Sequence, residues 1–161
     1  MINSRICGNV IETFSAKKGQ SGLPRPKTNK LELLYGFGIK NDKFAGKDEE
    51  KAVMIVGKIA YDIAKENGIN LELGSLGENV LFDFNPHDYA VGTVFQVGGT
   101  VLEITQSCTI CNHLAVFDDD LPLLVQDCRG LYCKILEGGT IEKDALVEVL
   151  NQWQPSKIIA S

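Results

Sequence analysis

Two cysteines and a histidine in the middle of the chain form its densest group of reactive side chains. Cys108 and Cys111 are three positions apart, and His113 follows two positions after Cys111. Thiolates are nucleophiles and ligands for soft metal ions, and an imidazole can bind a metal or lower the pKa of a neighbouring thiol. The spacing therefore indicates a site of sulfur or metal chemistry.

A β-hairpin is expected to position this reactive group. Thr93–Val97 and Thr100–Gln106 contain several β-branched residues, which favour strands. Between them stand Gly98 and Gly99, a pair typical of a tight two-residue turn. The cysteines follow the second segment closely, so the sequence predicts that they lie at a strand end.

One helix stands out in the rest of the chain. We expect it over Gly57–Asn67, with Gly68 as its C-terminal cap. Apolar residues follow the spacing of a single buried stripe along it, namely Val56, Ile59, Ala60, Ile63 and Ala64. The apolar segment Leu121–Gln126 fits a strand or a helix equally well.

Short apolar segments separated by turns make up most of the remaining chain. We expect strands over Arg5–Phe14, Leu31–Tyr35, Ala52–Val56, Val80–Phe84, Leu131–Leu136 and Ala145–Leu150. Gly138–Thr140 reads as a turn, and Cys133 as a small core residue of its strand. Many short strands and one helix favour a mainly β (α+β) fold, a closed barrel with short helical or loop insertions, over an alternating βαβ fold.

Length and composition limit the possible classes. The chain has 161 residues, of which 44% are hydrophobic, enough to bury the core of one domain. We expect a single domain over residues 1–161, with its core at about 5–150 and a short tail at 151–161. The net charge of −5 and the lack of a basic cluster argue against nucleic acid as a partner.

Cysteine use and hydropathy predict the compartment. The five cysteines are an odd number, in a chain too large to need disulfides, which fits a reducing environment. No apolar run is long enough to cross a bilayer, and Asn3 and Arg5 interrupt the start where a signal peptide needs apolar residues. We therefore expect a soluble, cytoplasmic protein with no membrane partner.

Two loops carry polar residues that a ligand can use. Ser15–Asn29 is rich in lysine, glycine and proline and is expected to be irregular. It is either a plain solvated loop or one that contacts an anionic cofactor through Lys17, Lys18, Arg25 or Lys27. The glycine-punctuated segment Leu73–Val80 is expected to display Glu78 and Asn79 at a turn.

From Gly8 to Val149 the chain resembles the MOSC family, the C-terminal domain of molybdenum cofactor sulfurases, in its small single-domain form. The matching residues occur in the family's order: Lys17-Lys18-Gly19, Gly36-Phe37-Gly38-Ile39, Asp42, Ala45-Gly46, Gly77-Glu78-Asn79-Val80, Gly92-Thr93, Leu102-Glu103-Ile104-Thr105-Gln106, Gly130-Leu131-Tyr132, Gly138-Gly139-Thr140 and Val147-Glu148-Val149. Cys111 falls five residues after Gln106, where the family's cysteine is found.

The resemblance implies a fold and a function. The fold is a closed β-barrel related to the barrel of pyruvate kinase. The family's cysteine is thought to accept sulfur as a persulfide from a pyridoxal-phosphate-dependent cysteine desulfurase, or to ligate the molybdenum of a bound pterin cofactor (molybdopterin). Related domains use that molybdenum to reduce N-hydroxylated compounds. The implied activity is that of a molybdenum-linked oxidoreductase or of a sulfur-transfer or carrier protein, with the cofactor or its biosynthetic enzymes as partners.

Site residues carry over position by position. Cys111 matches the sulfur or metal position, and Glu78 with Asn79 belongs to the loop that shapes the same pocket. Lys51, Lys27 and Asn112 are further expected cofactor contacts. Either role needs a thiolate, because only the deprotonated sulfur attacks a persulfide or binds a metal well. His113 is expected to lower the pKa of Cys111, and Cys108 to resolve a Cys111 persulfide by forming a disulfide.

The chain departs from the family motif at four positions. The family usually has histidines where this chain has Phe37 and Phe44, and a glycine where it has Asn41. An arginine is usual where Lys51 stands after a one-residue gap. The loss of these polar groups is expected to weaken an anion or pterin pocket.

Other uses of the cysteines remain open. Cys108, Cys111, Cys128 and Cys133 approximate a four-cysteine zinc pattern, in which the metal would be structural. A thioredoxin-like redox centre lacks its usual βαβ context. A non-catalytic binding module with buried, unreactive cysteines is the plainest alternative.

Overall fold

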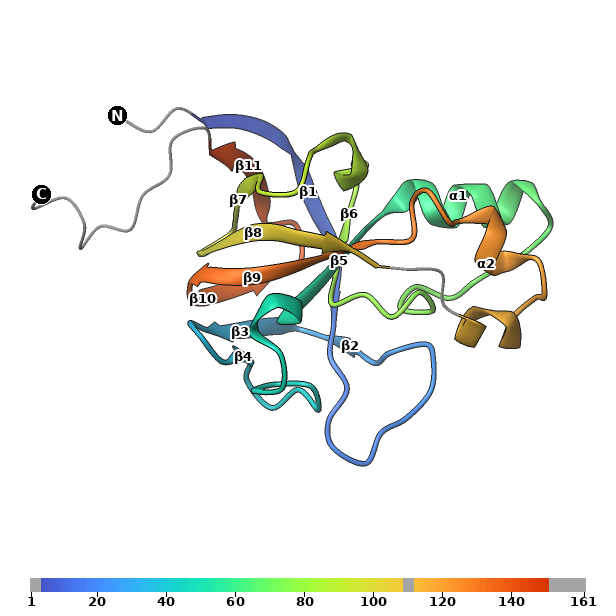
Figure 1. The fold of residues 1–161 in the computed structure, drawn as a ribbon, viewed down its shortest axis with the longest axis horizontal. Helices are drawn as coiled ribbons and strands as arrows, with labels where there is room; N and C mark the ends of the chain where they lie inside the picture. The colour runs from blue at the N-terminus through green and yellow to red at the C-terminus, as the bar shows by residue number, and fades with distance from the viewer. Residues whose placement is uncertain (1–3, 109–111, 151–161) are drawn as a thin grey trace, which may run out of the picture.

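The computed structural model describes residues 4–108 and 112–150 (Figure 1). The side chain of Asn112 is not described. Cys111, the central residue of the predicted site, lies outside the described residues, as does the predicted tail 151–161.

Seven strands close into a barrel (Figure 1). The sheet order is β11-β7-β8-β9-β5-β6-β1, and pairing of β1 with β11 closes it, with Arg5 opposite Val149. These strands are β1 Ser4–Phe14, β5 Val53–Gly57, β6 Val80–Phe82, β7 Val94–Val97, β8 Thr100–Ser107, β9 Leu131–Glu137 and β11 Leu146–Leu150. The mainly β barrel predicted from the sequence is thus confirmed, and β7 and β8 form the expected hairpin.

Within the described residues, four further strands lie outside this closed ring. β2 (Lys27–Thr28) extends the barrel sheet beside β1. β10 (Gly139–Glu142), β3 (Lys30–Leu34) and β4 (Gly38–Ile39) form a separate three-stranded sheet. The prediction of a turn at Gly138–Thr140 was wrong in part, because β10 begins inside that segment. Gly139 is needed there for a close approach: a Cβ at this position would collide with the carbonyl of Gly99.

Two apolar clusters, one inside the barrel and one outside, bury β5 on both faces. Val53 and Ile55 belong to the barrel interior, whereas Met54 and Val56 belong to the outer cluster. This alternation follows from the two-residue period of a strand. Helices α1 (Lys58–Glu66) and α2 (Leu121–Leu124) contribute side chains to the outer cluster. Met54 therefore points away from the barrel interior.

The buried face of α1 differs from the predicted stripe. Ala60 and Ala64 are buried as expected, but Ile59 is 39% exposed and Tyr61 is buried instead. The buried face of the helix differs from the predicted one because Val56 belongs to β5 and not to the helix. Gly68 has a φ of 79°, as the predicted helix end requires.

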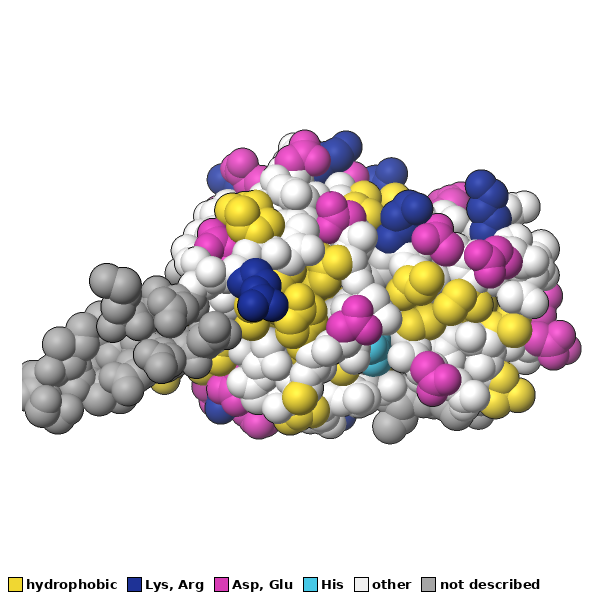
Figure 2. Space-filling view, turned by 90° about the horizontal axis from the view of Figure 1, so that it is seen from above, with side chains coloured by type: hydrophobic (Ala, Val, Ile, Leu, Met, Phe, Trp, Pro, Cys, Tyr) yellow, Lys and Arg dark blue, Asp and Glu magenta, His cyan; other side chains and the backbone are white. Residues whose placement is uncertain are grey.

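Apolar, acidic and basic side chains are interspersed on the molecular surface seen in Figure 2.

Three short 3₁₀ helices connect the strands. They are η1 (Glu49–Lys51), η2 (Pro86–Asp88) and η3 (Asn112–Val116). The ambiguous segment at 121–126 begins with the short helix α2. Within the described ranges, no helix has the length and apolar character needed to span a membrane.

Candidate functional site

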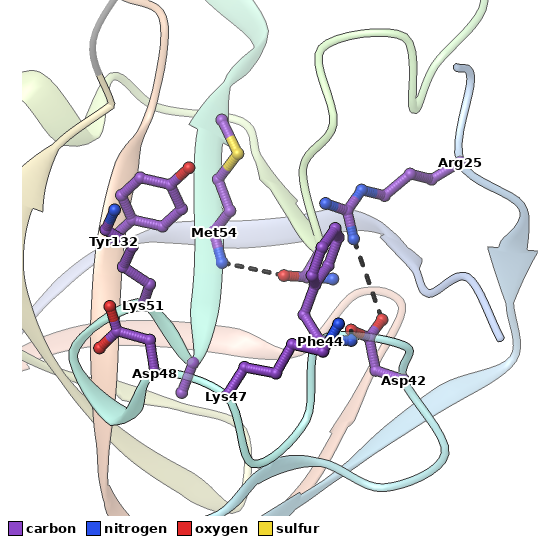
Figure 3. A pocket seen from close by; sticks show the side chains of 10 residues that line it. Arg25, Asp42, Phe44, Lys47, Asp48, Lys51, Met54 and Tyr132 are labelled. Atoms are coloured by element: carbon purple, nitrogen blue, oxygen red, sulfur yellow. Dashed lines mark hydrogen bonds and ion pairs between the residues drawn. The ribbon is translucent and has the colours of Figure 1, made fainter. Parts of the chain in front are cut away.

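Two adjoining pockets lie on the outer side of β5 and β9. The larger has a volume of about 530 Å³ and the smaller, shown in Figure 3, about 220 Å³. They share a wall made of Arg25, Phe44, Met54 and Tyr132. Met54 and Tyr132 are opposite each other in the β5–β9 register, so the two strands hold the centre of this wall.

The larger pocket is strongly cationic. Arg25, Lys43 and Arg129 line it, and its described lining includes no carboxylate. Arg129 is only 5% exposed. Its Nη1 donates a hydrogen bond of 2.5 Å to the carbonyl of Leu76, while its Nε has no partner among the described residues. A buried donor of this kind is costly unless a ligand accepts from it.

Arg25 offers a second unused donor. Its Nη1 lies 3.9 Å from Oδ1 of Asp42, without a hydrogen bond in the described structure. Burial lowers the pKa of Arg25, and the charges of Asp42 and Glu78 oppose that shift. A guanidinium stays protonated despite such a shift. Two desolvated guanidinium groups therefore line one pocket.

Asn79 supports the pockets from the interior. Its Oδ1 accepts a hydrogen bond of 2.9 Å from the N–H of Met54, and its Nδ2 donates one of 3.2 Å to the carbonyl of Phe14. The side chain is only 5% exposed, so the prediction of a displayed turn residue was wrong. Asn79 directly precedes β6, which lies between β1 and β5 in the sheet. Its side chain is therefore placed to pair with backbone groups of both neighbouring strands.

Glu78 is also buried rather than displayed. Its Oε2 accepts a hydrogen bond of 2.6 Å from the hydroxyl of Tyr61. That hydroxyl in turn accepts from the N–H groups of Gly74 and Leu76. Burial raises the pKa of Glu78, and the hydrogen bond from Tyr61 opposes the shift. Because Leu76 also receives the hydrogen bond of Arg129, the Tyr61–Glu78 pair fixes the turn that holds this arginine.

The predicted lysine contacts separate in the structure. Lys51 lines the smaller pocket, with its Nζ 5.4 Å from the ring centroid of Tyr132. Lys27 is exposed on β2 and lines neither of the two pockets. Lys17 lines another pocket, beside β3 and β4. Of the four basic candidates in the early loop, Arg25 is the one that lines both of the adjoining pockets.

Cys108 and His113, which lie before and after Cys111 in the sequence, are both in the region of the two pockets. Cys108 follows β8, and its thiol donates a hydrogen bond of 3.7 Å to the hydroxyl of Tyr132. Burial, together with this hydrogen bond, raises the pKa of Tyr132 to about 12. His113 lines the larger pocket. Cys111 itself lies outside the described residues.

The described cysteines do not support the four-cysteine zinc alternative. Cys133 lies in the barrel interior, whereas Cys108 and Cys128 belong to the outer cluster. Burial raises the pKa of both Cys128 and Cys133, which disfavours the thiolate that zinc needs. Over residues 4–108 and 112–150, no three His, Cys, Asp or Glu side chains converge as a metal site would require.

The structure shows the surroundings of two departures from the family motif, Asn41 and Phe44. Asn41 has a φ of 69°, a left-handed conformation that glycine adopts freely and asparagine tolerates. Phe44 is surrounded by cations, with Arg25, Lys43 and Lys47 at 5.1, 5.2 and 5.6 Å from its ring centroid. The ring thus makes cation–π contacts in place of the polar contacts that a histidine would offer, and a weaker anion pocket stays a prediction.

Sequence reasoning missed Arg129, Lys43 and Tyr132 as site residues. For Tyr132 a signal was present: an inward-facing Cys133 on a strand implies an outward-facing neighbour. Arg129 directly precedes the Gly130-Leu131-Tyr132 run of the family motif, yet nothing local shows that it is buried. Lys43 had no distinguishing signal.

Comparison with solved structures shows the same fold in other proteins. A protein described as hypothetical has a TM-score of 0.73 at 18% identity, and the match covers 91% of this chain and 70% of that protein's chain. The YuaD protein from Bacillus subtilis has a TM-score of 0.71 at 17% identity, and the match covers 95% of this chain and 100% of YuaD. YiiM from Escherichia coli has a TM-score of 0.68 at 16% identity, and the match covers 92% of this chain and 72% of YiiM.

Sequence comparison identifies the family. No curated protein is significantly similar to the chain in sequence. The profile of the MOSC domain, however, matches residues 41–148. That range runs from the loop of Phe44 through β5, β8 and β9 and so includes most of the pocket wall. The chain therefore belongs to the MOSC domain family.

Proposed function

We propose that this MOSC-domain protein binds the molybdenum cofactor in its larger pocket. The observation that carries the proposal is the pair of desolvated guanidinium groups, Arg25 and Arg129, each with a nitrogen atom that has no hydrogen-bond partner in the described structure. An anionic ligand would satisfy both donors and offset the cost of burying their charge.

The residues present fit a phosphorylated pterin. Planar guanidinium groups match the oxygen atoms of a phosphate, and Lys43 adds a third positive charge at the same pocket. Leu23, Phe44 and Met54 supply apolar and aromatic wall for a ring system. When bound, the cofactor would supply molybdenum for redox chemistry. The side chains of this protein would bind and orient the cofactor and exclude part of the water from the pocket.

Cys111 is proposed as the sulfur carrier or molybdenum ligand of this site. Its support is the family position in the sequence and the placement of its neighbours: Cys108 contacts Tyr132, and His113 lines the larger pocket. If a cysteine desulfurase delivers sulfur, the thiolate of Cys108 can attack the inner sulfur of a Cys111 persulfide. That step forms a disulfide and releases hydrosulfide.

Molybdenum content tests the cofactor proposal. We expect protein expressed in cells that make the cofactor to contain near-stoichiometric molybdenum by elemental analysis. Arg129→Met and Lys43→Met should each lower the affinity for the cofactor about tenfold or more, and with it the molybdenum content, since a charge-assisted hydrogen bond contributes roughly 1.5–3 kcal/mol. Cys111→Ala should lower the molybdenum content as well if its thiolate is a metal ligand, and should leave it unchanged if Cys111 only carries sulfur. Lys65→Met, on the exposed side of α1, is the matched control and should retain the metal.

The alternatives give different results. Wild-type protein without molybdenum that is labelled by a persulfide reagent, with the label lost in Cys111→Ala, would favour sulfur transfer without bound cofactor. Stoichiometric zinc, or equal molybdenum in wild type and Arg129→Met with both proteins folded by circular dichroism, would contradict the proposed pocket.

A further inference from the structure

We propose that the smaller pocket is a separate binding site for a small organic carboxylate with an apolar body. This inference goes beyond cofactor binding and does not depend on it. Lys51, which the sequence predicted as a cofactor contact, lines this pocket and not the larger one. A ligand here would lie across the Arg25, Phe44, Met54 and Tyr132 wall from the larger pocket.

Two lysines give the rim of the smaller pocket its available positive charge. The Nζ of Lys47 lies 5.6 Å from the ring centroid of Phe44, and that of Lys51 lies 5.4 Å from that of Tyr132. In Figure 3, Lys51 lies beside Tyr132, whereas Lys47 extends toward Phe44. Within the described residues, neither ammonium group is in an ion pair. Both are therefore free to pair with a ligand.

The carboxylates of the pocket are largely occupied. Asp42 is buried, and its oxygen atoms accept hydrogen bonds from the hydroxyl of Ser15 at 2.6 Å and the N–H of Phe44 at 2.9 Å. Its charge is offset by Arg25. Asp48 caps η1 by accepting from the N–H of Glu50 at 3.0 Å. Asp48 thus keeps one oxygen atom and its negative charge in the pocket that the two lysines also line.

Apolar surface and volume set the size of the ligand. Met54 lies between the rings of Phe44 and Tyr132 in Figure 3, and Ala52 also lines the smaller pocket. Its volume of about 220 Å³ lies below the roughly 300–1,000 Å³ of most ligand pockets. A single ring or short chain bearing one carboxylate fits these features. Benzoate is a suitable probe, with benzamide as its uncharged analogue and benzylamine as its cationic one.

Met54 lines both pockets, so its signal reports a ligand on either side of the shared wall, and the Lys47 and Lys51 variants identify the smaller pocket. The chain contains only two methionines, Met1 and Met54, so ¹³C-methyl-methionine labelling gives two NMR signals, which Met54→Leu assigns. Titration of cofactor-free protein with benzoate should shift the Met54 signal saturably. Benzamide and benzylamine should bind more weakly than benzoate, and Lys47→Met and Lys51→Met should each weaken benzoate binding about two- to fivefold. Lys65→Met should leave it unchanged.

Asp48→Asn tests whether the smaller pocket prefers a negatively charged ligand. Asparagine keeps the η1 cap and removes the negative charge, so benzoate binding should tighten about two- to fivefold. Weaker benzoate binding in Asp48→Asn, equal shifts with benzamide, or no effect of the two lysine variants would overturn the proposal. Because these titrations use protein without cofactor, they succeed or fail independently of the molybdenum content that tests the larger pocket.

Discussion

At the scale of single residues, Asn79 has a structural function that its turn-like sequence context conceals. Its amide joins the backbone of Met54 on β5 to that of Phe14 at the end of β1. An asparagine side chain suits this position because it combines one acceptor and two donors. The pocket wall around Met54 thus depends on a buried amide behind it.

Asn79→Ala should lower the free energy of unfolding by about 2–4 kcal/mol, because it leaves two buried backbone groups without partners. Asn67→Ala is the matched control: the Asn67 side chain also bonds to a backbone carbonyl, but at an exposed position. Urea denaturation measures both. A loss in Asn79→Ala no greater than in the control would show that the two buried hydrogen bonds contribute little.

At the scale of elements, a histidine joins η2 to the start of β9. The Nε2 of His87 accepts a hydrogen bond of 3.0 Å from the N–H of Gly130, the residue after Arg129. Burial lowers the pKa of His87 from its ordinary 6.5, and the charges of Asp127 and Asp88 partly oppose this shift. The neutral imidazole is the form that can accept the hydrogen bond.

This hydrogen bond predicts the direction of a pH effect. A histidine whose pKa is lowered on folding contributes stability that is fully present above its unfolded pKa, near 6.5. That contribution is lost as the pH falls from there through the lowered folded value. Chemical denaturation at a series of pH values from about 8 to 5 should show this loss in wild type and a flatter profile in His87→Ala. A profile as steep in His87→Ala as in wild type would contradict this prediction.

At the scale of the whole molecule, close backbone contacts bring the smaller sheet against the barrel. Gly139, at the start of β10, has a φ of 155° and approaches Gly99 in the β7–β8 turn. Gly139→Ala should therefore cost the strain of its backbone conformation and, in addition, about 1–3 kcal/mol of overpacking.

Gly92→Ala separates these two costs. Gly92 has a φ of 95°, and nothing lies within 4 Å of a Cβ placed on it, so its substitution adds strain alone, about 1–2 kcal/mol. Thermal unfolding of both variants gives the difference. Equal losses would mean that the contact between β10 and the hairpin turn relaxes at no cost.

The sequence predicted those features that depend on local patterns. Residue alternation identified most strands of the barrel, and it placed Cys133 in the core, where it is fully buried. The pockets were not predictable in this way. Arg25 and Arg129 lie in segments far apart in the sequence, and they line one pocket only because β1, β5 and β9 fold into one barrel. The burial of Glu78 and Asn79 is likewise a tertiary effect that a glycine-rich turn motif does not encode.

The shared wall between the two pockets has a thermodynamic consequence. Arg25, Phe44, Met54 and Tyr132 contribute to both pockets at once, so a ligand that reorients these side chains on one side changes the shape and charge met by a ligand on the other. Such energetic coupling is reciprocal. Whatever factor a molecule in the larger pocket applies to affinity in the smaller one, a molecule in the smaller pocket applies the same factor in return.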